Sequence, residues 1–309
     1  MNILVTGGLG SIGHILCKRL LKEGHGVIIV DDCSVGRKEF LEELSGATFY
    51  EASVADYEAF EKAFAENTID AVVHLAAKHY IPYCEKHPKK TTDINVGGTL
   101  NTLLLMRQYG VPRIILASTS SVYKPETRAY REDDAIEPVH VYGVSKLLAE
   151  EAVQWYARGF GFTYSILRFF NVYGTDDLVP HVIPEILAQA RASDTIQVGN
   201  LESKRDFIRA EDIVEAIILC LASKEAENKI YNLGTGRALS IREVIRAAKK
   251  ASGKDLKIEI VESKKRAVDP PVLLSDNSKI RQELGWEPGR EFDLKEIYEK
   301  TKFWPVYER

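Results

Sequence analysis

Tyr142 and Lys146 stand four residues apart in the segment Tyr-Gly-Val-Ser-Lys, about one strand and loop after Thr119. On a helix, residues at positions i and i+4 share a face, so the phenol and the ammonium are expected to lie close together. A nearby positive charge favours the phenolate and lowers the pKa of a tyrosine from about 10, so that Tyr142 could act as a base at neutral pH. The Thr119 hydroxyl would hold the substrate oxygen between them. These residue types predict a catalytic set of Tyr142, Lys146 and Thr119.

A tyrosine and a lysine at this spacing also fit an exposed, solvated helix face. The interpretation as a catalytic pair therefore depends on whether the rest of the chain supplies a cofactor site and a fold that brings Thr119 to the helix.

A glycine-rich loop follows the first apolar run of the chain and precedes a segment with helical spacing. Glycines at three positions give the pattern G-x-x-G-x-x-G, which allows a tight turn and close approach of the backbone to a pyrophosphate. The free N–H groups at the start of the following helix favour phosphate binding. The residues predicted to hold the cofactor here are Gly7, Gly10, Ser11, Ile12 and Gly13.

Two acidic residues, Asp31 and Asp32, end the second apolar run. A carboxylate at this position accepts hydrogen bonds from the hydroxyls of an adenosine ribose and repels a 2′-phosphate. The cofactor predicted is therefore NAD rather than NADP, although Arg37 nearby speaks against this preference.

Short apolar runs alternate with helical patterns, which predicts an α/β fold with a Rossmann-type doubly wound parallel sheet and a smaller C-terminal substrate-binding part. Strands are expected at 3–5, 27–30, 71–75, 114–117, 164–167 and 229–233, and helices at 12–20, 57–66, 92–109 and 145–160. Residues 1–173 are expected to form the NAD-binding domain, with returning segments near 207–233. Residues 174–309 would mainly form the substrate-binding part.

The composition is ordinary for a globular protein: 309 residues, 45% hydrophobic, with a formal net charge of -4. There is no basic surplus of the kind that nucleic-acid binding requires. The four cysteines are scattered, which argues against a metal site or disulfides and favours a reducing compartment. The N-terminus shows neither a signal peptide nor a long apolar segment, so we expect a cytoplasmic protein that does not bind membranes.

Several motifs occur in a fixed order around these residues. They are the glycine loop, His74 to Ala77, Tyr142 to Lys146, Arg168 to Gly174, Arg205 to Ile208, Tyr231 to Gly234, Arg266 to Asp269 and Leu284 to Pro288. Together they resemble the extended short-chain dehydrogenase/reductase family, in its nucleotide-sugar epimerase/dehydratase branch, with the UDP-glucose 4-epimerases as the most similar group. The resemblance covers residues 2 to about 288.

The resemblance implies further roles. Leu75, Ala76 and Ala77 would line the cofactor site near the nicotinamide ribose. Ser53 and Val54 fall where relatives place an aspartate and an apolar residue against the adenine. Arg205 and Arg266 would hold the diphosphate, since guanidinium groups match phosphate oxygens. The remaining substrate ligands would be Asn171 and Asp269. Members of the family also suggest a homodimer formed by helices 92–109 and 145–160.

The residues after Thr119 separate the possible reactions. Related 4,6-dehydratases typically carry Asp-Glu there, because elimination of water needs an added acid and base, whereas this chain has Ser120 and Ser121. The sequence thus favours a nucleotide-sugar 4-epimerase that oxidises C4 reversibly, rotates the 4-keto intermediate and reduces it again. The alternatives are a dehydratase, decarboxylase or 4-keto reductase of the same family, a reductase acting on a non-nucleotide substrate, or a non-catalytic NAD-binding protein.

Overall fold

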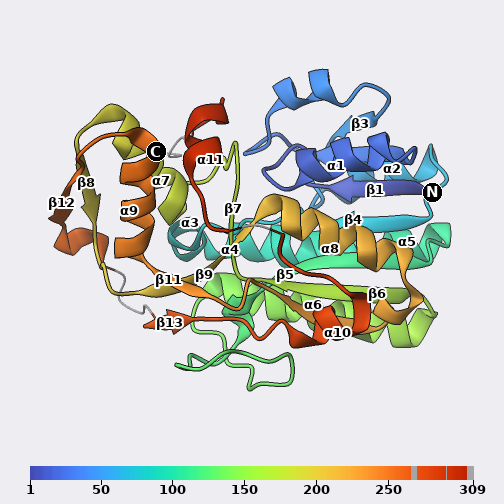
Figure 1. The fold of residues 1–309 in the computed structure, drawn as a ribbon. Helices are drawn as coiled ribbons and strands as arrows, with labels where there is room; N and C mark the ends of the chain where they lie inside the picture. The colour runs from blue at the N-terminus through green and yellow to red at the C-terminus, as the bar shows by residue number, and fades with distance from the viewer. Residues whose placement is uncertain (266–269, 290, 305–309) are drawn as a thin grey trace.

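The computed structural model describes residues 1–265, 270–289 and 291–304. Its largest element is a parallel sheet of seven strands in the order β10-β6-β5-β4-β1-β2-β3 (Figure 1). The strands are β1 (Asn2–Thr6), β2 (Gly26–Asp31), β3 (Thr48–Glu51), β4 (Ala71–His74), β5 (Arg113–Thr119), β6 (Thr163–Phe169) and β10 (Lys229–Leu233). This arrangement confirms the predicted Rossmann-type fold.

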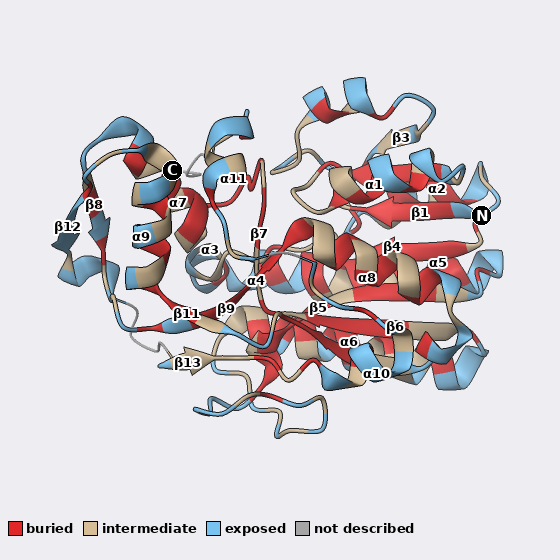
Figure 2. Ribbon diagram, viewed as in Figure 1, coloured by how far each residue is buried: buried red, intermediate tan, exposed pale blue. Residues whose placement is uncertain are grey.

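Helices cover both faces of this sheet and leave its strands buried between two apolar cores (Figure 2). Side chains alternate along a strand, so Ile3 and Val5 enter one core while Leu4 enters the other. The first core contains residues of α1 (Gly13–Lys22), α8 (Ala210–Ala222) and α10 (Ser278–Leu284). The second contains residues of α2 (Tyr57–Ala65), α5 (Gly98–Tyr109) and α6 (Val141–Phe160).

The remaining chain builds a third apolar core beside the large sheet. Its strands are short: β7 (Asn171–Tyr173), β8 (Thr195–Val198), β9 (Lys204–Arg209), β11 (Ala238–Ser240), β12 (Lys257–Ile260) and β13 (Val272–Leu273). Strand β9 pairs with β7, β11 and β13, and β8 pairs with β12. The helices of this part are α7 (Val182–Ala192), α9 (Ile241–Ser252) and α11 (Lys295–Lys300). None of these six strands was predicted from the sequence.

Short helices fill the connections. They are the 3-10 turns η1 (Lys38–Glu43), η3 (Ser120–Val122), η4 (Lys224–Ala226) and η5 (Glu262–Lys264), and the α-helices α3 (Ile81–Lys86) and α4 (Pro88–Thr92). The five-residue π-helical segment η2 (Asp93–Gly97) leads into α5. Within the described ranges, no helix is both long and apolar enough to cross a membrane.

Helix α6 begins at Val141, earlier than the Ser145 expected from the sequence. The reason is His140, whose ring Nδ1 accepts a hydrogen bond from the Gly143 N–H at 3.1 Å and caps the first turn. Tyr142 therefore belongs to the first turn of the helix, and Lys146 follows one turn later.

Candidate active site

A cavity of about 980 Å³ lies at the carboxyl ends of the parallel strands, between the large sheet and the second part. In open α/β sheets ligands bind at this edge. The site residues predicted from the sequence line this cavity wherever the structure describes them: Gly7, Gly10, Ser11, Ile12, Gly13, Asp31, Asp32, Ser53, Val54, Leu75, Ala76, Ala77, Thr119, Tyr142, Lys146, Asn171 and Arg205. Arg266 and Asp269 fall outside the described residues.

The glycine loop brings the start of α1 against the ends of β1 and β4. Gly7 has a φ of +68°, and a Cβ added there would lie 2.9 Å from the Ala76 backbone nitrogen. At Gly13 an added Cβ would lie 2.1 Å from the Gly7 carbonyl oxygen. Both positions therefore require glycine for the loop to fold tightly under the helix N-terminus. Ser11 also connects this loop to the segment after β7, since its hydroxyl accepts the Leu178 N–H at 3.0 Å.

Asp31 ends β2 and is buried at the cavity wall. Its carboxylate accepts backbone N–H groups from Leu9 at 2.9 Å and from Cys33 at 2.8 Å. Burial raises the pKa of Asp31, while these two hydrogen bonds lower it. Asp32 is more exposed and accepts the Ser34 N–H at 2.9 Å. The Asp31 carboxylate, which is predicted to bind the ribose hydroxyls, thus lies at the cavity wall next to the glycine loop.

The residues predicted around the adenine and the nicotinamide ribose come from two further strand ends. Ser53 accepts the Ala55 N–H at 3.3 Å, and Val54 packs against the start of α5, where a Cβ on Gly98 would lie 2.4 Å from its side chain. After β4, the Ala76 N–H donates to the Thr6 hydroxyl at 3.2 Å. These contacts tie the loops after β3 and β4 to their neighbours at the cavity wall.

Helix α6 approaches the end of β5 through Gly143. A Cβ added to this glycine would lie 2.3 Å from the Ser121 carbonyl oxygen, so the first turn of the helix touches the backbone of η3 directly. Thr119 is the last residue of β5, and its hydroxyl accepts the Ser121 N–H at 3.1 Å. This packing places Tyr142 in hydrogen-bonding contact with Thr119.

The electrostatics of the pair differ from the prediction. Burial raises the pKa of Tyr142 above its ordinary value, and the hydrogen bond with Thr119 is the influence that lowers it. The prediction that the Lys146 ammonium brings this pKa down toward neutrality is therefore wrong for this structure, because desolvation of the phenol dominates. Burial also lowers the pKa of Lys146 to about 8, against an opposing effect of Glu150.

Two predicted substrate ligands enter the cavity from the second sheet. Asn171 begins β7, and its side-chain Oδ1 is buried without a hydrogen-bond partner among the described residues. Such an unsatisfied acceptor is costly unless a ligand or water meets it. Arg205 lies on β9, is buried, and donates to the carbonyl oxygens of Lys204 at 2.7 Å and Pro270 at 2.8 Å.

Sequence reasoning assigned no role to two other groups at the cavity. Lys78 is buried after β4 and its Nζ donates to the Ser34 hydroxyl at 2.8 Å. His181 pairs with the buried Asp177 carboxylate at 3.2 Å, and its ring lies 5.3 Å from that of His79. The spacing Asp-x-x-x-His was visible in the sequence, but only the fold shows that these residues line the same cavity.

Each acidic residue that lines the described part of the cavity already has a hydrogen-bond or ion-pair partner within the protein. Asp31 and Asp32 accept backbone N–H groups, Asp177 pairs with His181, and Glu185 pairs with Lys264 at 2.6 Å. The two residues that follow Thr119 are serines in η3. Within these described residues, an acid for elimination of water is not placed beside Tyr142. The described residues also contain no group of three or more potential metal ligands.

The chain is similar to known proteins over almost its whole length. The chain is 32% identical to a UDP-glucose 4-epimerase of Lacticaseibacillus casei, across 98% of this chain and 96% of the relative. A Thermotoga maritima UDP-glucose 4-epimerase, solved with UDP-glucose, superposes with a TM-score of 0.87 at 31% identity and 97% coverage of both chains. The Thermus thermophilus enzyme in complex with NAD gives a TM-score of 0.89 at 29% identity, covering 97% of this chain and 99% of that one.

A family model described as GDP-mannose 4,6 dehydratase matches residues 4–301. This match covers nearly the whole chain and confirms the resemblance inferred from the ordered motifs. The protein belongs to the GDP-mannose 4,6 dehydratase family.

Proposed function

We propose that the protein is an NAD-dependent UDP-sugar 4-epimerase, an isomerase of the UDP-glucose/UDP-galactose type. The observation that carries this proposal is the single cavity in which the glycine loop, the Thr119–Tyr142–Lys146 set, and the ligands Asn171 and Arg205 meet. Similar proteins over almost the whole chain are UDP-glucose 4-epimerases, one solved with UDP-glucose and another with NAD.

The cavity residues fit NAD. The glycine loop leaves no space for side chains at Gly7 and Gly13, as a backbone cradle for a pyrophosphate requires, and Asp31 offers a carboxylate to the ribose hydroxyls. When bound, NAD would supply the acceptor and then the donor of the hydride at the sugar C4. Lys146 and the wall formed by residues 75–77 would hold its nicotinamide ribose, and residues 53–54 would face its adenine.

Tyr142 is proposed as the group that removes and returns the proton of the sugar 4-hydroxyl. A raised pKa makes the phenolate a strong base toward the sugar 4-hydroxyl, and the phenol formed in the oxidation holds the proton that it returns in the reduction. Thr119, hydrogen-bonded to Tyr142, would share the substrate oxygen and stabilise the phenolate, while Lys146 would hold the nicotinamide ribose beside them. In the reduction Tyr142 returns the proton that it removed in the oxidation, so the full reaction neither consumes nor releases a proton.

The sugar nucleotide is proposed to lie against the second part of the molecule. The buried Oδ1 of Asn171 would accept a hydrogen bond from a hydroxyl, and the Arg205 guanidinium, with Arg266, would hold the diphosphate. Asp269 would meet the nucleoside ribose. In this proposal residues 1–173, with the returning segment 207–233, form the NAD-binding domain, and 174–309 mainly bind the substrate.

The test is incubation of the purified protein with UDP-galactose and related UDP-, GDP- and dTDP-sugars, followed by chromatographic separation of the C4 epimers. We expect interconversion of UDP-galactose and UDP-glucose without net formation of NADH. Tyr142→Phe should lose most turnover and still bind NAD. Absence of any C4 epimer from the whole panel would refute the proposal.

A dehydratase is the second candidate, because the family model carries that description. Two features favour the epimerase: the acidic residues of the cavity already have partners within the protein, and serines follow Thr119 where elimination of water would need an acid and a base. A product lighter by one water, detected by mass spectrometry, would decide for the dehydratase, and net consumption of NADH would indicate a 4-keto reductase.

We also propose a homodimer that joins α5 and α6 of two copies. Large apolar side chains are exposed on these two helices: Leu104, Tyr109, Val144, Leu148, Trp155 and Phe160. Exposed apolar side chains concentrated on neighbouring helices are typical of an interface. Light scattering should give twice the mass of the 34.7 kDa chain for the wild type. For the Leu148→Asp variant it should give the mass of a single chain.

A further inference from the structure

A buried carboxylate stands behind the catalytic pair and has no part in the mechanism above. Glu150 follows Lys146 by four residues on α6, as Lys146 follows Tyr142, so all three share one face of the helix. Glu150 and Lys146 are 1% and 2% exposed. A charge this deeply buried needs partners, since desolvation of a lone carboxylate costs several kcal/mol.

Both oxygens of Glu150 are engaged. Arg168 of β6 donates from Nε to Oε1 at 3.0 Å and from Nη2 to Oε2 at 2.7 Å, a bidentate pair. The Ser118 hydroxyl also donates to Oε1. Ser118 directly precedes Thr119 on β5, so the carboxylate connects the catalytic helix to the strand end that carries the catalytic hydroxyl.

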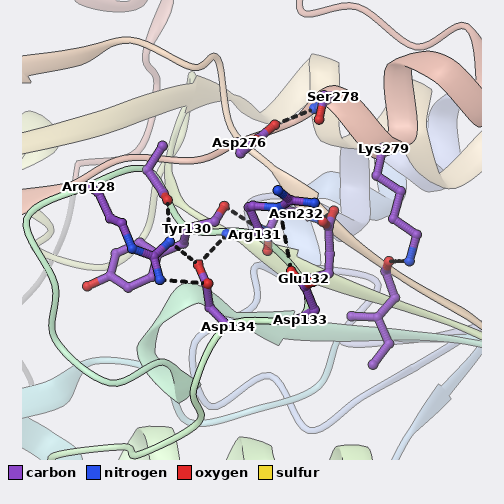
Figure 3. Close-up of polar contacts among 12 residues, drawn as sticks. Arg128, Tyr130, Arg131, Glu132, Asp133, Asp134, Asn232, Asp276, Ser278 and Lys279 are labelled. Atoms are coloured by element: carbon purple, nitrogen blue, oxygen red, sulfur yellow. Dashed lines mark hydrogen bonds and ion pairs between the residues drawn. The ribbon is translucent and has the colours of Figure 1, made fainter.

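The guanidinium of Arg168 is itself held on its far side. Its Nη1 donates to the Tyr123 hydroxyl at 2.9 Å and to the Glu132 carbonyl oxygen at 3.0 Å. The Asn232 backbone N–H in turn donates to the Glu132 carboxylate at 2.8 Å (Figure 3). These contacts hold the Arg168 guanidinium in one position. Because both oxygens of Glu150 accept hydrogen bonds from this guanidinium, they also fix the orientation of the Glu150 carboxylate.

A buried ion pair of this kind is weak evidence for stability, because well-packed apolar residues often serve as well. Its charge, however, bears on Lys146. The titratable or charged groups around Lys146 are Tyr142 and Glu150 on α6, His74 on β4, and Arg168 beyond Glu150. Burial keeps His74 neutral by lowering its pKa to about 3. Glu150 supplies the carboxylate among these groups, and it lies between the Lys146 amine and the Arg168 guanidinium.

We propose that Glu150 is a positioning residue of the epimerisation: it keeps the buried Lys146 amine protonated and aligns the Ser118–Thr119 strand end with Tyr142. The functional part of this proposal rests on the function proposed above. Without Glu150, the Lys146 amine would lose its compensating anion in a site where burial already favours the neutral amine.

The test compares the wild type with Glu150→Gln, which keeps the shape of the side chain and removes its charge. Carbon-13 NMR titration of labelled lysines, assigned with Lys146→Met, reports the pKa of Lys146 directly. In Glu150→Gln we expect this pKa to fall by at least about one unit, since removing a nearby charge at an effective dielectric constant of about 20 has effects of this size. The alkaline limb of the kcat/KM profile should move to lower pH by the same amount.

Tyr123→Phe is the matched control, because it removes a hydrogen bond to Arg168 and leaves every charge near Lys146 in place. It should leave the pKa of Lys146 and the alkaline limb unmoved. If Glu150→Gln does not fold, the double variant Glu150→Gln/Arg168→Met, which removes both charges of the pair, is titrated in its place. It should also show the Lys146 pKa lowered.

An unchanged Lys146 pKa in the folded variant would overturn the proposal. Because the titration needs no turnover, it reads the charge effect even if the protein proves not to be an epimerase. An inactive wild type with a shifted Lys146 pKa would count against the proposed function alone.

Discussion

Replacing Gly143 by alanine tests whether the close contact between α6 and η3 positions the catalytic tyrosine. The added Cβ would lie 2.3 Å from the Ser121 carbonyl oxygen, whereas ordinary contacts begin at 3.4 Å, so 3.4 minus 2.3 gives 1.1 Å of required movement. The obstructing atom is backbone, so the first turn of α6 must move away and take Tyr142 with it. A displacement of about 1 Å at a catalytic group costs about 10²-fold in rate.

Gly159→Ala on the same helix is the matched control. An added Cβ there meets nothing within 4 Å. Both substitutions gain the higher helix propensity of alanine, about 0.5–1 kcal/mol, so the difference between the variants isolates the effect of the contact. Gly159→Ala should be slightly more stable than the wild type and equally active. Gly143→Ala should fall below Gly159→Ala in unfolding free energy by about 1–3 kcal/mol, as overpacking does.

The assays are kcat for UDP-galactose, urea unfolding followed by circular dichroism, and NAD content of the purified protein. Gly143→Ala should keep its NAD, because the glycine loop lies on other elements. The reasoning is refuted if Gly143→Ala retains wild-type kcat, or if Gly159→Ala loses as much activity.

Three further predictions follow from the cavity. Gly13→Ala should abolish NAD binding, measured as cofactor released on denaturation, because its Cβ would lie 2.1 Å from the Gly7 carbonyl oxygen; retention of NAD would contradict this. Thr119→Val should reduce kcat/KM, because the variant loses the hydroxyl that lowers the pKa of Tyr142; an unchanged kcat/KM would exclude this role of Thr119. For Lys146, the pKa is about 8 in the folded chain and about 10.4 when unfolded, so the unfolded state binds more protons between these values. The free-energy cost of burying the charged amine is present below pH 8 and is relieved as the pH rises. Lys146→Met should therefore stabilise the protein more at pH 7 than at pH 9.5, as measured by urea unfolding. Equal stabilisation at both pH values would refute the burial argument.

Six strands of the large sheet and four of its helices were predicted, because their signals are local, whereas β3, α8 and α10 were not. Strands buried on both faces read as continuous apolar runs, as in β1, β2, β4 and β5, and the glycine loop stands directly between a strand and a helix. Several strands of the second part are very short: β7 and β11 have three residues each, and β13 has two. Such short segments carry no periodicity, and only their pairing partners far along the chain make them strands.

The sequence by itself determined which residue types could carry out a redox isomerisation: the glycine spacing, the carboxylate at the end of β2, and the Tyr142–Lys146 pair with Thr119 upstream. Tertiary structure decided how those groups behave. Burial raised the pKa of Tyr142 where spacing alone predicted a lowered one, and Gly143 let α6 reach the backbone of η3. It also joined Lys146 and Glu150 with Arg168 of β6 in one buried cluster. The physical reason is that desolvation and long-range contacts depend on everything packed around a group, and spacing along the chain does not contain that information.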